Sequence, residues 1–203
     1  MVAENAFLSS QEGLEEHFGR VFDINTVLGY DFNTFFRFCQ YLGVHVYKPA
    51  GFAGLLQSPE EFVKHHVGNC WDQTELHRKW FEGHGYKVKT YLLYYYLNDS
   101  CCPSHSIVAF REGDKWCWFE PMFCGTAVEY SGVRRYCTEE DLLKDFQRVF
   151  ALNGQKSGVL PQKLDDARWS LYEYLGPKYR IPDREFYTHC RKGRKIAIWM
   201  NQK

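Results

Sequence analysis

The sequence predicts an α+β fold in which N-terminal helices pack on an antiparallel sheet. Up to residue 84, capping residues are followed by apolar residues at helical spacing. After that residue, runs rich in β-branched and aromatic residues predict strands. The 203 residues contain no internal repeat and no low-complexity linker, so we expect a single domain over residues 1–203. A chain of this length buries enough surface to be stable without disulfides or a structural metal.

Two helices are predicted before residue 45. Ser9 and Glu12 form a capping-box pattern ahead of apolar residues that are spaced as one helix face over residues 14–22. Asp31 precedes a second, strongly apolar stripe over residues 32–42. We interpret both apolar faces as core.

Two further helices precede the predicted sheet. Ser58 has the pattern of a helix cap, with Pro59 at the first helical position and Glu61 three residues after the cap, and this helix is expected to end near residue 66. A longer helix is predicted over residues 70–84, where glycines end it.

Three strands are predicted over residues 86–97, 106–111 and 116–120. The dipeptide Gly113-Asp114 suits a two-residue turn between the second and third of them. These strands therefore form an antiparallel hairpin beside a longer strand.

The C-terminal extension, residues 138–203, is predicted to be mixed and mainly helical. A capped helix is expected over residues 138–152, a flexible connection over 154–158 and another helix over 169–175. The tail is expected to end in a strand over residues 196–199.

Charge and hydropathy exclude several classes of partner. The 25 basic and 25 acidic residues give a net charge of zero, which argues against a general polyanion binder, and we interpret the basic run at residues 191–195 as a solvated surface. Apolar stretches such as residues 91–97 are far shorter than the ~20 residues that a membrane helix needs. The N-terminus shows no signal-peptide pattern. We expect a soluble, cytoplasmic protein with neither a membrane nor a nucleic acid as its partner.

The eight cysteines form neither a zinc-ligand spacing nor a secreted disulfide pattern. Most are interpreted as reduced, buried, small hydrophobes. The adjacent pair Cys101-Cys102 is poor for zinc but leaves a redox role open. The cysteines are Cys39, Cys70, Cys101, Cys102, Cys117, Cys124, Cys137 and Cys190.

Cys70 stands apart because it directly follows Gly68-Asn69 at the start of a predicted helix. Unpaired backbone N–H groups and the positive end of the helix dipole favour a thiolate there. A structural cysteine at a helix start is the alternative. Gln73 and Glu75, one turn later, are candidates for the cleft wall, but we interpret them as a solvated helix face.

A thiolate nucleophile needs an imidazole partner, and His105 is the best candidate because it opens a strand directly after a loop. We expect surface or packing roles for His65, His66, His77 and His84. No partner pattern is visible for His17, His45 and His189.

The hairpin register predicts a partner for His105. With a two-residue turn at Gly113-Asp114, Ile107 lies opposite Glu120, and His105 shares a face with Ile107. His105 and Glu120 are then diagonal neighbours with Cβ atoms roughly 7 Å apart, a gap that the Glu side chain spans. A three-residue turn would put them on opposite faces, and Glu120 would then be a strand-end carboxylate facing solvent.

These residues together resemble the catalytic core of the transglutaminase-like superfamily. The pattern is Gly-x-Cys-Trp ending at Trp71, then His105 opening a strand, then Glu120-Pro121 closing the next strand. Within the superfamily the chain is most similar to small, uncharacterised bacterial transglutaminase-like proteins. The resemblance covers about residues 61–123, and it implies a papain-like fold with the cysteine on a helix and the other two residues on neighbouring strands.

The resemblance also implies the role of each residue. Cys70 attacks an acyl carbon, His105 holds the thiol proton and Glu120 orients the imidazole, although the superfamily usually has Asp at that position. The backbone N–H of Cys70 would meet the oxyanion. Candidates for a second oxyanion donor or for the cleft wall are Asn69, Gln40, Tyr41 and Trp71.

We therefore expect a thiol-dependent acyl-transfer enzyme that acts on an amide or ester through a Cys70 acyl-enzyme: a cysteine peptidase, isopeptidase, deamidase or transamidase. Its substrate would be a protein, a peptide or a small amide, and no cofactor or metal is expected. His77 and His84 share a helix face but lack a third ligand at metal spacing. The alternative is a non-catalytic binding module that keeps the fold and fills its cleft with aromatic side chains such as Trp71, Trp116 and Trp118.

Overall fold

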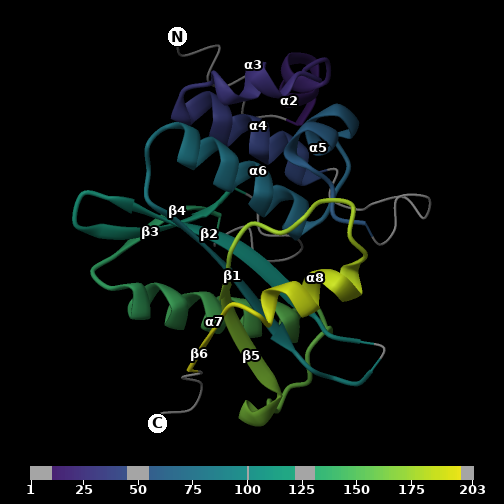
Figure 1. Ribbon diagram of the computed structural model, residues 1–203, viewed down its shortest axis with the longest axis vertical. Coiled ribbons are helices and arrows are strands. Elements are labelled where there is room, and N and C mark those ends of the chain that lie inside the picture. The colour runs from purple at the N-terminus through teal and green to yellow at the C-terminus, as the bar shows by residue number, and fades with distance from the viewer. Residues whose placement is uncertain (1–10, 45–54, 100, 122–130, 198–203) are drawn as a thin grey trace.

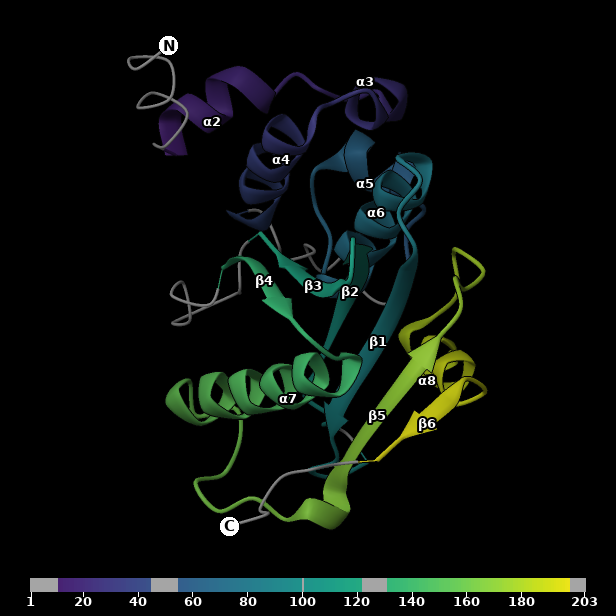
Figure 2. The same cartoon turned by 90° about the vertical axis from the view of Figure 1, so that its left-hand side faces the viewer.

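A six-stranded antiparallel sheet divides the molecule, with helices on both of its faces (Figures 1 and 2). The computed structural model describes residues 11–44, 55–99, 101–121 and 131–197. The strands follow the order β4-β3-β2-β1-β5-β6. The helices are α2 (Gln11–Phe18), α3 (Ile24–Leu28), α4 (Phe32–Val44), α5 (Pro59–His65), α6 (Cys70–Gly83), α7 (Glu139–Lys156) and α8 (Asp183–Cys190), with a short 3₁₀ helix, η3 (Asp166–Arg168). The strands are β1 (Val88–Tyr95), β2 (Ser104–Glu112), β3 (Lys115–Glu120), β4 (Gly132–Tyr136), β5 (Trp169–Tyr174) and β6 (Arg194–Ile196). The α+β class expected from the sequence is confirmed.

Three apolar clusters join the helices to the sheet. Helix α7 covers one face, where Trp118 and Phe146 are fully buried. On the other face, α2 to α6 pack over β2 and β3, and α8 packs over β1 and β5 (Figure 2). Because both faces are covered, the central strands carry apolar side chains on both sides.

The expected helix starts are confirmed where the structure describes them. Ser58 and Glu61 form the capping box of α5, with Pro59 at its first position. Helix α6 begins at Cys70, as expected, and Thr138 caps α7 by accepting a hydrogen bond from the Asp141 N–H. The expected cap Ser9 lies outside the described residues.

The hairpin turn is also confirmed. Gly113 and Asp114 form a two-residue turn in which Gly113 has a φ of 61°, and Glu112 pairs with Lys115 on either side of it. The ladder runs in this register to the pair Val108 and Phe119. Side chains of β2 and β3 therefore lie on the faces that the turn predicts.

The helix predicted over residues 169–175 is wrong, because this segment forms strand β5 between β1 and β6. Trp169 and Leu171 pack beneath α7, whereas Tyr172 and Tyr174 pack beneath α8. Burial on both faces of a central strand removes the alternation that would have identified it, although its aromatic residues favour strands.

The flexible connection predicted over residues 154–158 is wrong as well, since α7 continues to Lys156. Gly154 is buried inside the helix, and a Cβ at this position would lie 2.5 Å from Leu160 Cδ1. Gly154 therefore does not end the helix. Its missing side chain leaves room for the chain after the helix to fold back against it.

Several other elements differ from the expectation. Helix α2 ends at Phe18, short of residue 22, and α3, β4 and α8 were not predicted. Strand β6 overlaps the expected strand over residues 196–199 only at Ile196, and residues 198–203 are not described. No helix in the described ranges is both long enough and apolar enough to cross a membrane.

Replacement of Phe146 by Ala tests the α7 side of the core. Phe146 is fully buried and packs edge-on against Trp118 at 5.5 Å between ring centroids. We expect Phe146→Ala to lower the free energy of unfolding by ~3–5 kcal/mol, measured by urea denaturation. Leu175→Ala, at a side chain that is 84% exposed, is the control and should change it by less than ~0.5 kcal/mol. Equal effects of the two changes would contradict this packing.

Candidate functional site

The first turn of α6 holds Cys70 in a defined position. The Asn69 side chain accepts hydrogen bonds from the N–H groups of Trp71 (2.9 Å) and Asp72 (3.3 Å). The Asp72 carboxylate in turn accepts from the N–H groups of Asn69 and Gln57, each at 2.8 Å. The capping box thus binds the backbone N–H groups of the residues before and after Cys70. The N–H of Cys70 itself takes no part in it.

Gly68 is required by close packing just before this turn. A Cβ at Gly68 would lie 2.6 Å from the Phe62 ring and 2.8 Å from the Asp72 carboxylate. A larger residue would therefore displace Asp72, which caps the helix that carries Cys70.

Two hydroxyl groups connect Cys70 to strand β2. The carbonyl oxygen of Cys70 accepts hydrogen bonds from Thr74 Oγ1 (2.8 Å) and Ser106 Oγ (3.1 Å), and the two hydroxyl oxygens lie 2.8 Å apart. Thr74 lies one turn along α6, and Ser106 directly follows His105 on β2. The backbone of Cys70 is thus fixed relative to the strand that carries His105.

His105 and Glu120 meet as the hairpin register predicts. His105 Nε2 lies 2.7 Å from Glu120 Oε2, and both side chains are buried. From α7, the Phe146 and Phe150 rings lie 6.0 and 6.4 Å from the imidazole, centroid to centroid. The alternative of a solvent-facing Glu120 is wrong, because the strand end is covered.

The other side of the imidazole faces Cys70. Burial by itself lowers the pKa of His105, but the Glu120 carboxylate and a hydrogen bond with the Cys70 side chain outweigh it and raise the pKa to about 10. The ring is therefore protonated at neutral pH and lies between a carboxylate and a sulfur.

The remaining cleft candidates have other contacts. Gln40 Oε1 accepts from Arg37 at 3.0 Å, and the Tyr41 hydroxyl lies 2.9 Å from His66 Nδ1 in the N-terminal helical layer. Trp71 packs against Phe186 and Tyr187 of α8. The structure therefore places Asn69 and Trp71 beside Cys70, whereas these hydrogen bonds hold Gln40 and Tyr41 among the N-terminal helices.

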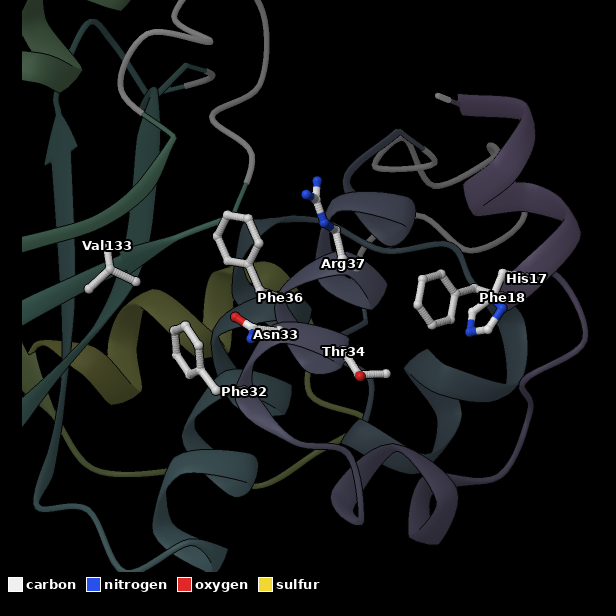
Figure 3. A pocket seen from close by; sticks show the side chains of 8 residues that line it. All are labelled: His17, Phe18, Phe32, Asn33, Thr34, Phe36, Arg37 and Val133. Carbon is white, nitrogen blue, oxygen red and sulfur yellow. The ribbon is translucent and has the colours of Figure 1, made fainter. Parts of the chain in front are cut away.

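A hollow of about 580 Å³ lies among α2, α4 and β4. Figure 3 shows its lining side chains, with Phe32, Phe36 and Val133 toward one end. Arg37, the partner of Gln40, is one of its lining residues. The elements around this hollow supply none of the side chains at Cys70, His105 or Glu120.

The solvated face predicted for Gln73 and Glu75 is wrong, since Gln73 is 5% and Glu75 0% exposed. Glu75 accepts a 2.7 Å hydrogen bond from Arg78 and one from the Tyr179 hydroxyl, and burial raises its pKa. The segment after β5 covers this face of α6, a tertiary contact that helical periodicity does not reveal.

The other described histidines on α5 and α6 have packing contacts. His77 is buried against Phe35 and Phe119, where burial and the charge of His105 lower its pKa to about 3. His84 stacks on Trp80 at 3.9 Å between ring centroids. These contacts agree with the packing roles expected for them. His65 contacts Gln57, and His66 contacts Tyr41 and Val21.

Comparisons with known proteins add little to this geometry. No protein-family model matches the chain, and no curated protein matches it. Among solved structures, LapG from Legionella pneumophila is similar with 12% sequence identity and a TM-score of 0.32, over 72% of this chain and 93% of that chain. A likeness this weak carries no conclusion about chemistry, so the function must be argued from the site.

Replacement of Glu120 by Gln tests the electrostatic link to His105. Burial lowers the pKa of His105 and the Glu120 charge opposes this effect, so the pKa should fall from its raised value when the charge is removed. NMR titration of the imidazole measures this pKa. Glu112→Gln is the matched control on β2, because the exposed Glu112 pairs with Arg135 instead and should leave His105 unchanged. An unaltered His105 pKa in Glu120→Gln would contradict the link.

The same pair predicts how stability depends on pH. The pKa of His105 is higher in the folded protein than its ordinary value of about 6.5. The pair therefore contributes its full stabilisation below about pH 6.5 and loses it as the pH rises towards 10. We expect the free energy of unfolding of the wild type to fall more steeply over this range than that of Glu120→Gln. If the free energy of unfolding fell equally steeply with pH in both proteins, this expectation would be contradicted.

Proposed function

We propose that this protein is a thiol-dependent acyl-transfer enzyme with a papain-like, transglutaminase-like triad of Cys70, His105 and Glu120. The observation that carries the proposal is the buried imidazole of His105, which lies 2.7 Å from Glu120 Oε2 and has a pKa raised by the Glu120 charge and by a hydrogen bond with the Cys70 side chain. A cysteine on a helix start, with its base on a strand and the orienting acid on the next strand, is the arrangement that nucleophilic thiol catalysis needs.

The reaction follows from this arrangement. In the reactive form the proton resides on His105, and the Cys70 sulfur, as a thiolate, forms a bond to the acyl carbon of an amide or ester. The carbonyl electrons move to the oxygen and return as the bond to the leaving amine or alcohol breaks, and His105 gives its proton to that group. Water or an amine then loses a proton to His105, attacks the thioester and releases the thiolate.

The backbone supplies one donor for the oxyanion. The Asn69 side chain takes the N–H groups of Trp71 and Asp72, so the N–H of Cys70 remains for the developing negative charge. The hydroxyls of Thr74 and Ser106 hold the next peptide unit, through the carbonyl of Cys70. We assign Thr74 and Ser106 as positioning residues.

A binding module without chemistry fits this site less well. Burying a charged imidazole and a carboxylate costs desolvation energy that an apolar pair of similar size avoids. A protein that only kept the fold could hold an apolar pair here instead, whereas a thiol nucleophile requires the imidazole and the carboxylate.

The relative reactivity of the cysteines tests the proposal. Cys101 and Cys137 are exposed and Cys70 is only partly exposed, so accessibility alone would direct an alkylating agent to the first two. We expect brief treatment with limiting iodoacetamide at neutral pH to label Cys70 first, as measured by peptide mass spectrometry.

Cys137 is a demanding internal control, because it is exposed and the Lys115 ammonium lies 3.4 Å from its sulfur. Cys70→Ala should keep the melting temperature nearly unchanged and abolish labelling by an activity-based thiol probe. Labelling of Cys101 or Cys137 ahead of Cys70 would contradict the assignment.

A further inference from the structure

A groove lies between α8 and the sheet, next to the start of α6. Its volume is about 860 Å³, within the range of sites that hold small ligands. Aromatic side chains of α6, β1 and α8 form much of its wall, together with two arginines. The lining residues are Trp71, Tyr94, Tyr96, Asp99, Cys101, Cys102, Arg184, Tyr187, Thr188 and Arg191.

The groove is built from direct neighbours of the proposed catalytic residues. Trp71 follows Cys70 and packs against Tyr187 at 5.1 Å between ring centroids. The Tyr187 hydroxyl lies 2.8 Å from the hydroxyl of Ser104, the residue before His105. Cys70 itself packs against the same apolar cluster. Residues next to Cys70 and next to His105 in the sequence therefore form or contact the wall of this groove.

The two arginines that line the groove lack acidic partners. Among the described residues, the Arg184 guanidinium has neither a hydrogen bond nor an ion pair. Arg191 donates to the Tyr94 hydroxyl at 3.1 Å and stacks over that ring, without a carboxylate partner in the described ranges. The groove's carboxylate, Asp99, accepts a 2.6 Å hydrogen bond from Tyr96. Two arginines and one aspartate thus line the groove, which leaves it with a net positive charge.

We propose, on the basis of the proposed function, that this groove binds an acidic side chain of a peptide substrate, with Arg184 and Arg191 as its carboxylate-binding residues. Arginine presents a planar fork of N–H donors that matches a carboxylate, and the aromatic wall provides apolar surface for the neighbouring residues of the peptide. Asp99 and the zero net charge of the chain disfavour a polynucleotide in the same place.

Peptide binding to the Cys70→Ala protein tests this proposal without any chemical step. The probes are an acetylated, amidated peptide Ala-Phe-Glu-Ala and its Gln counterpart, titrated by calorimetry. We expect the Glu peptide to bind about fivefold tighter at low salt, and the difference to shrink as salt is added.

Arg184→Gln should remove most of this preference, since Arg184 makes no other described side-chain contact and its loss should leave the fold intact. Lys192→Gln is the matched control, because it removes one exposed positive charge next to Arg191 but outside the groove. Arg191→Lys, which keeps the charge but loses the fork, should weaken the preference in part.

Three results would overturn the proposal. They are equal or undetectable binding of the two peptides, a preference that survives Arg184→Gln unchanged, and tighter, Arg184-dependent binding of a short oligothymidylate. Failure of the proposed function is separate: a Glu preference lost in Arg184→Gln, together with an unreactive Cys70 in the wild type, would leave an acidic-peptide groove without the enzyme.

Discussion

A protonated imidazole enclosed between a carboxylate and a sulfur is the interaction on which the rest of the site depends. Taking His105 and Glu120 out of water is costly, and it is tolerated because each group satisfies the other at 2.7 Å. Phe146 and Phe150 of α7 close the imidazole off from solvent. The same burial strengthens every electrostatic contact within the site.

Cys70 meets this imidazole only when three parts of the structure are correctly placed. The hairpin aligns β2 with β3, the capping box sets where α6 begins, and Ser106 joins that start to β2 by a hydrogen bond to the Cys70 carbonyl. Catalytic groups act only when they are held close to their productive geometry. The position of the nucleophile is thus determined by hydrogen bonds to its backbone, whereas that of the base is determined by its contacts with Glu120 and with the rings of α7.

The parts of the fold that could be predicted from the sequence are those with local causes. A Gly-Asp turn sets the hairpin register, so the contact between His105 and Glu120 followed from spacing alone, although their catalytic role stays a proposal. Strand β5 and the buried Glu75 could not be predicted, because distant segments cover both faces of the strand and one face of α6. Helix α8 is a further case, since its apolar face packs against Trp71 of α6 and residues of β1 and β5, contacts that the local sequence pattern does not reveal.

The central claim is that Glu120 acts on Cys70 through His105, and a double-mutant cycle tests it most directly. The measured quantity is the rate of Cys70 alkylation by iodoacetamide in the wild type, Glu120→Gln, His105→Asn and the double variant. We expect each single change to slow alkylation, and the double variant to react no more slowly than His105→Asn alone. The claim would be contradicted if the two substitutions slowed alkylation by factors that multiply in the double variant, or if His105→Asn left the alkylation rate unchanged.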